Sequence, residues 1–263
     1  MDTIIFWAPI VLLFLSAFIA AIVKLRTKDI CLKKLSDFFC LIKTPNNRWL
    51  WGDLRVFADA IELTYSQAVA YDQKHAKVSY LLYKADLSQV QFIARPVPKK
   101  NSEDYLKWKK ELAAIHNPSF ARKTARKIRN LFNLLRDAFS QTLTAIIGVL
   151  TRNPKLQNIA GNASQKRFNE MGQTVIGSVP NSYEHVLEHY LGEKVVCESM
   201  RDGKLVEDIG ILQEYSSKYL LLRGVILNET IPEDFEGFED DAKEFDLILP
   251  RGASVVRHLA KSM

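Results

Sequence analysis

The sequence is poor in the residues from which compact catalytic motifs are built. Its 263 residues include only three cysteines, five histidines and eleven glycines. Cys31, Cys40 and Cys197 form no C-x-x-C pair, which excludes a disulfide framework and fits a reducing compartment. The glycines are dispersed and no G-x-S-x-G segment occurs, so neither a phosphate-binding loop nor a nucleophile elbow is indicated.

Charge is missing altogether from residues 4–23, a run of twenty residues with one serine and one proline. A helix rises about 1.5 Å per residue, so this run can span the roughly 30 Å hydrocarbon core of a bilayer. Lys24, Arg26 and Lys28 follow at once, whereas no basic residue precedes the run. We therefore expect residues 1–24 to form an uncleaved single-pass transmembrane anchor, with the N-terminus outside and the C-terminal body cytoplasmic.

The charged residues form two blocks of opposite sign. Residues 99–136 carry eleven lysines or arginines and three acids, and residues 229–246 carry nine acids and one lysine. The basic block fits anionic lipid, nucleic acid, pairing with the acidic block or a solvated helix face. We predict that it contacts an anionic surface, with lipid first and the acidic block of a neighbouring subunit second.

Periodicity divides the remainder of the chain. Apolar residues between Ile30 and Ile42 recur mostly at three- and four-residue spacing, which predicts a juxtamembrane amphipathic helix in residues 25–48. Residues 49–98 are rich in β-branched and aromatic residues and predict a small β unit. Its strands are expected at residues 54–65, 78–83 and 90–95.

Residues 99–192 are expected to form a basic helical region. Its longest helix is predicted over residues 119–151, where one apolar stripe follows the N-cap Ser119. This helix fits either the core of a bundle or oligomer, or a membrane surface. The candidate interaction surface on it is the basic cluster Arg122, Lys123, Arg126, Lys127 and Arg129.

Residues 193–263 again predict strands, with the acidic insertion 229–246 between them. Asp202-Gly203 is a strong hairpin dipeptide, and further strands are expected at residues 210–215, 219–226 and 245–256. The segment from Gly52 to Tyr83 resembles the segment from Gly203 to Leu222. Internal duplication and a chance match among strand-forming residues both remain open.

Residues 195–258 resemble an Sm-like small β-barrel in their Asp202-Gly203 turn, Gly210-Ile-Leu212, apolar residues 220–222 and Arg251-Gly252-x-x-Val255. The resemblance implies a strongly bent barrel, edge pairing into rings and an unusual backbone at Gly252. RNA-binding members carry an Asp…Met-Asn element where this chain has residues 215–219 without the Asn, so RNA binding is not implied. Arg251 fits a phosphate contact or, in our interpretation, a structural hydrogen bond in a turn.

One segment has catalytic spacing. His185-Val-Leu-Glu188-His189 has the form H-x-x-E-H, which resembles the inverted zinc-protease motif. On a helix, the two histidines could share a metal ion, with Glu188 as the general base. That family needs a distant third carboxylate and has longer chains, and the same pattern is common on exposed helices. We therefore expect no catalytic residue, cofactor or metal.

The expected fold class is α+β, with one N-terminal transmembrane helix, a helical middle region, a C-terminal Sm-like barrel and room for a second small β unit at residues 49–97. The expected function is a membrane-anchored cytoplasmic scaffold that forms homo-oligomers and binds an unidentified partner protein or anionic lipid. Two alternatives remain. One is a metal-dependent hydrolase that uses the H-x-x-E-H cluster, and the other is a membrane-tethered nucleic-acid-binding module, although nucleic acid is the less expected partner.

Overall fold

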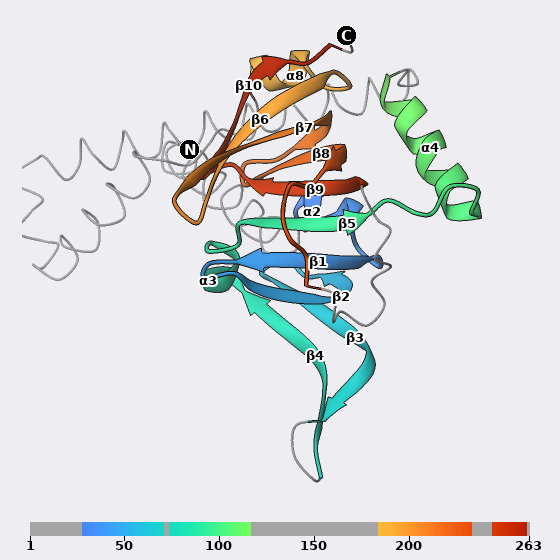
Figure 1. The fold of residues 1–263 in the computed structure, drawn as a ribbon, viewed down its shortest axis with the longest axis vertical. Coiled ribbons are helices and arrows are strands. Elements are labelled where there is room, and N and C mark those ends of the chain that lie inside the picture. The colour runs from blue at the N-terminus through green and yellow to red at the C-terminus, as the bar shows by residue number, and fades with distance from the viewer. Residues whose placement is uncertain (1–27, 71–73, 117–183, 233–243, 262–263) are drawn as a thin grey trace, which may run out of the picture. The chain divides into compact units, whose positions relative to one another are not determined.

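The structure is a computed structural model that describes residues 28–70, 74–116, 184–232 and 244–261 (Figure 1). These residues form ten strands and four helices. The chain divides into two compact units, Met1–Arg95 with Thr230–Asp240, and Pro96–Glu229 with Asp241–Met263. Every strand pairing described below, in either unit, is antiparallel.

The described part of unit 1 begins with a short helix that Asp29 caps, because the Asp29 carboxylate accepts the N–H of Cys31 at 2.9 Å. Five strands follow, and their order across the sheet is β5-β1-β2-β3-β4. The elements are α2 (Ile30–Lys34), β1 (Phe39–Thr44), β2 (Arg48–Val56), β3 (Ala60–Ala70), β4 (Ala76–Tyr83), α3 (Lys84–Leu87) and β5 (Phe92–Pro96).

Unit 2 contains a longer helix and then a second set of a short helix and five strands. The strand order is β10-β6-β7-β8-β9. The elements are α4 (Glu103–His116), α8 (His185–His189), β6 (Lys194–Arg201), β7 (Lys204–Tyr215), β8 (Tyr219–Ile226), β9 (Glu244–Pro250) and β10 (Ser254–Leu259).

The two units therefore share one plan, in which a short helix precedes five strands arranged fifth-first-second-third-fourth. The same link joins the helix to the sheet in both. The N–H of Asp37 donates to the carbonyl of Leu54 at 2.7 Å, and the N–H of Gly192 donates to the carbonyl of Leu212 at 2.8 Å. Asp37 and Gly192 both have positive φ, 67° and 90°, so the chain reverses in the same way after each helix.

A glycine occupies the same register position in the second strand of each unit. Gly52 lies opposite Cys40, and Gly210 lies opposite Val195. A Cβ at Gly52 would lie 2.7 Å from the carbonyl oxygen of Thr64, and one at Gly210 would lie 2.6 Å from Val225. Both strands therefore need glycine because a neighbouring strand crosses too closely for a side chain.

The cores differ in chemistry although the strand orders agree. Of the described residues in unit 1, the only buried charged or polar side chains are Lys43 and Arg95. The described part of unit 2 buries seven: Ser199, Arg201, Asp208, Gln213, Glu214, Arg223 and Asp246. Unit 1 is thus held by an apolar core, whereas unit 2 buries ion pairs among its leucines.

The expected fold class is wrong, because the described chain is mainly antiparallel sheet and its longest helix, α4, has 14 residues. The amphipathic helix expected in residues 25–48 is limited to the five residues of α2. Residues 40–43 are instead fully or nearly fully buried in β1, which pairs with strands on both sides. A run of four buried residues fits a central strand. The three- and four-residue spacing of the apolar residues is therefore not evidence of a helix here.

The expected single-pass membrane protein must also be corrected. Within the described ranges, no helix is both long enough and apolar enough to cross a bilayer. Residues 1–24, for which we expect an anchor, and the helix expected at residues 119–151 lie outside the described residues.

Two turn predictions had different outcomes. The Asp202-Gly203 hairpin is confirmed, because Arg201 pairs with Lys204 and both turn residues have positive φ, 47° and 77°. The unusual backbone expected at Gly252 is wrong, since Gly252 is not among the glycines with positive φ and a Cβ there would meet nothing within 4 Å.

Candidate functional site

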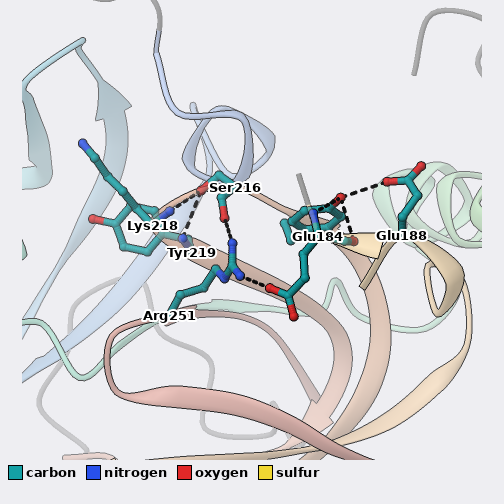
Figure 2. Close-up of polar contacts among 7 residues, drawn as sticks. Glu184, Glu188, Ser216, Lys218, Tyr219 and Arg251 are labelled. Atoms are coloured by element: carbon teal, nitrogen blue, oxygen red, sulfur yellow. Dashed lines mark hydrogen bonds and ion pairs between the residues drawn. The ribbon is translucent and has the colours of Figure 1, made fainter. Parts of the chain in front are cut away.

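Arg251 fastens two turns of unit 2 to each other (Figure 2). It lies between β9 and β10, and its Nη1 donates to the carbonyl of Ser216, between β7 and β8, at 2.8 Å. Its backbone N–H donates to the carbonyl of Lys218 at 2.8 Å. The Nη2 group pairs with the carboxylate of Glu184, which lies just before α8. One guanidinium therefore joins three segments that are distant in sequence.

Tyr215 strengthens the same junction. Its ring lies 5.9 Å from the Arg251 guanidinium, and its hydroxyl donates to Glu188 Oε2 at 3.1 Å. The N–H of Glu184 donates to the Tyr215 hydroxyl at 3.3 Å. The hydroxyl of Ser216 accepts the N–H groups of Lys218 at 3.1 Å and Tyr219 at 3.0 Å, which closes the β7–β8 turn. We call these residues, Glu184, Glu188, Tyr215, Ser216 and Arg251, the Arg251 cluster.

The contacts of the Arg251 cluster indicate a structural role. The Arg251 side chain is 8% exposed, and its charge faces the Glu184 carboxylate and a backbone carbonyl. An incoming phosphate would have to displace both partners. The geometry thus gives Arg251 the structural hydrogen bond that we considered, rather than an open anion site.

The H-x-x-E-H segment forms α8, which has only five residues. His185 and His189 are exposed, while Glu188 is half-buried and accepts the Tyr215 hydroxyl. In the part of the chain that the structure describes, no three His, Cys, Asp or Glu side chains are placed to hold a metal ion together. The structure therefore offers the hydrolase alternative no third ligand among these residues.

The other candidate interaction residues are not placed. Arg122, Lys123, Arg126, Lys127 and Arg129 lie outside the described residues. Of the basic block, residues 99–136, the structure describes only residues 99–116, which include α4.

A buried charge network in unit 2 was missed by sequence reasoning. Arg223 on β8 pairs with Asp246 on β9 at 2.6 Å, and both side chains are fully buried. Helix α4 contacts both members of this pair. Trp108 Nε1 donates to the Asp246 carboxylate at 3.1 Å, and Glu111 pairs with Arg223 at 2.5 Å. A charged residue inside each of two apolar strands was the only sequence signal.

A second buried pair lies at the β6–β7 hairpin. Arg201 pairs with Asp208, and its Nη1 lies 3.6 Å from Glu229. Burial raises the pKa of Asp208 although Arg201 opposes the shift. Burial also raises the pKa of the neighbouring Cys197 thiol to about 12, so this thiol stays protonated at neutral pH and is not an activated nucleophile.

Two strands are paired on one side only among the described residues. β4 pairs with β3 alone, and β10 pairs with β6 alone. Apolar side chains are exposed on both, with exposed fractions of 61% for Val78 and 46% for Leu81 on β4, and 41% for Val255 and 49% for Leu259 on β10. An edge that combines unpaired backbone groups with apolar side chains is a site for strand pairing.

No family model, curated protein or solved structure matches this chain. A function must therefore come from the geometry of its own residues. Of the features described, the Arg251 cluster and the buried charges are internal, whereas β4 and β10 face outward.

Proposed function

We propose that this chain is an interaction protein that self-associates through its edge strands, with β4 of one copy beside β10 of the next. The observation that carries the proposal is the single-sided pairing of β4 and β10. Their exposed apolar side chains favour burial against another strand, and pairing would satisfy the outward backbone groups. Because the two edges differ, the contact is head-to-tail and produces a ring or a filament.

The Sm-like resemblance supports this proposal. We propose that residues 195–258 form such a barrel. The strand order β10-β6-β7-β8-β9, preceded in the chain by the short helix α8, fits this proposal. The resemblance implies rings made by pairing of edge strands. Unit 1 has the same strand order, so one copy would present one edge from each unit.

The register of β10 identifies the backbone groups that a partner strand would meet. The N–H of Met200 donates to the carbonyl of Ala253 at 2.9 Å, so these two residues form a hydrogen-bonded pair. Such pairs alternate along an antiparallel ladder, and Val256 lies opposite Cys197 three residues further on. The N–H of Val256 therefore points away from β6, toward the open edge.

This geometry permits a substitution that blocks the edge and preserves the β6–β10 ladder. Val256→Pro removes an outward N–H group, whereas Val256→Ala keeps it and serves as the matched control. For β4, Val78→Lys with Leu81→Lys places charge on the exposed edge. Sedimentation of the full-length chain measures the size of the assembly.

We expect the wild type and Val256→Ala to form assemblies and each blocked variant to be monomeric. An equimolar mixture of the two blocked variants should form dimers and nothing larger, because each supplies the one edge that the other lacks. A monomeric wild type contradicts the proposal. A β4-blocked variant that dimerises by itself contradicts the head-to-tail arrangement.

Salt supplies an independent check. On β10, Arg257 already pairs with Glu198 of β6 at 2.9 Å, so the proposed contact depends on apolar and backbone groups. Screening does not weaken such contacts, and assembly should therefore persist at high ionic strength. Assembly that dissolves in salt would mean that ion pairs, rather than apolar and backbone contacts, hold the copies together.

A further inference from the structure

Four side chains of unit 1, three of them aromatic, form two contacting pairs. The Arg48 guanidinium lies 5.4 Å from the centre of the Tyr80 ring, and its Nη2 donates to the Tyr80 hydroxyl at 3.1 Å. The rings of Trp51 and Tyr65 are 6.0 Å apart and tilted by 49°. We name Arg48, Trp51, Tyr65 and Tyr80 the aromatic surface.

The two halves of the aromatic surface adjoin each other. The pKa of Tyr65 is raised, first by burial and then by Tyr80, while Arg48 lowers it, so all three groups lie within electrostatic range. β2 supplies Arg48 and Trp51, β3 supplies Tyr65, and β4 supplies Tyr80. Arg48 is exposed and the three rings are half-buried, which leaves part of each ring in contact with solvent.

The hairpin beside the aromatic surface extends beyond the end of β2. β2 pairs with β3 only as far as Thr64, whereas β3 and β4 continue together to Ala70 and Ala76 (Figure 1). Residues 60–83, which make up the hairpin, contain two acids and two lysines. Lys74 and Lys77 are both exposed on this extension.

We infer that the aromatic surface binds single-stranded nucleic acid, with bases on the tyrosine and tryptophan rings and a phosphate near Arg48. Every base has a π-face, so an exposed ring next to a cation accepts a base of any sequence. The exposed Arg48 at this surface favours a polyanion over a cationic partner. An anionic lipid or acidic peptide would need the cations and would leave the rings without a role.

Fluorescence anisotropy of a labelled single strand of about 20 nucleotides tests the inference, with RNA and DNA as separate arms and the full-length protein as the receptor. Tyr65→Ala and Tyr80→Ala should each weaken binding by about tenfold or more, because each removes a stacking ring. Tyr83→Ala is the matched control, since Tyr83 lies on the same strand outside the aromatic surface and is 59% exposed. It should bind as the wild type does.

Two further readouts separate binding from structural support. Tyr65→Phe retains the ring and should restore binding, even if Tyr65→Ala fails to fold. Trp51 fluorescence should be quenched on binding, and Trp51→Phe should remove that part of the quenching while most of the affinity remains.

The phosphate contact has its own signature. Arg48→Gln should reduce the slope of log affinity against log salt by about 0.7, the value for one phosphate contact on a single strand. Lys109→Gln on α4 should leave the slope unchanged. Absent binding, equal affinity of both tyrosine-to-alanine variants and the wild type, or equally tight binding of a duplex would overturn the inference.

Discussion

Units 1 and 2 build the same strand order around different cores. In unit 1, Thr64 lies opposite Ser79 in the pairing of the third and fourth strands. The equivalent positions in unit 2, next to the Leu222–Leu247 pair, carry Arg223 and Asp246. Two small polar side chains in one unit thus correspond to a fully buried ion pair in the other.

The features that recur belong to the backbone. Both units have a positive φ after the helix and a glycine in the second strand at the point where the neighbouring strand crosses. The core side chains vary because several packings can satisfy the same strand order. The comparison indicates that the backbone requirements define this plan, and that the buried charges make unit 2 the more sensitive of the two.

Removal of the Asp246 carboxylate should have the largest effect. Asp246→Asn removes the buried negative charge that faces Arg223 and leaves the half-exposed Glu111 as its acidic partner, and breaking such a pair costs about 3–5 kcal/mol. The equivalent change in unit 1, Ser79→Ala, should alter the free energy of unfolding by no more than about 0.5 kcal/mol. Urea unfolding of both variants measures the difference. Equal effects would remove the distinction between the two cores.

The two strand glycines should give the next largest effect. Gly52→Ala and Gly210→Ala each place a Cβ under 3 Å from a neighbouring strand, so each should lower the free energy of unfolding by about 1–3 kcal/mol. Gly252→Ala is the control and should be neutral within about 0.5 kcal/mol, because its surroundings are open. If alanine at Gly52 or Gly210 leaves the free energy of unfolding unchanged, the two units do not both require glycine where the neighbouring strand passes.

The pH dependence of stability should sharpen the comparison with a smaller effect. The pKa of Asp208 is raised above 3.8 by burial, so the folded state binds its proton more tightly than the unfolded state does. This group therefore contributes stability when protonated, and that contribution is lost as the pH rises from about 4 through the raised pKa. In urea unfolding at a series of pH values, Asp208→Asn should reduce this decline. An unchanged decline would mean that other groups cause it.

Local signals in the sequence account for part of the fold. Asp202-Gly203 specifies its hairpin because both residues tolerate positive φ. The strand at residues 219–226 is recognisable from its apolar run. The strand expected at residues 54–65 is two strands, since the N–H of Phe57 donates to the carbonyl of Ala60 at 2.9 Å and closes a turn. A turn without glycine or proline gave too little signal.

Long-range contacts could not be predicted in this way. Trp108 and Asp246 are 138 residues apart, and nothing local to either residue indicates their hydrogen bond. The suspected duplication aligned Gly52 with Gly203, whereas the strand register aligns Gly52 with Gly210. The hairpin before Gly210 is longer than its counterpart, and only pairing across the sheet reveals the shift.

The central claim is that each unit is held by its own core, and the native cysteines test it most directly. Cys31 and Cys40 are buried in unit 1 and Cys197 is buried in unit 2, so each thiol reports the opening of its own unit. Pulse labelling in rising urea, read by mass spectrometry, should show Cys197 of Asp246→Asn reacting at lower urea than in the wild type. Cys31 and Cys40 should react where they do in the wild type. If all three thiols shift together, the two units share one cooperative core and the account is contradicted.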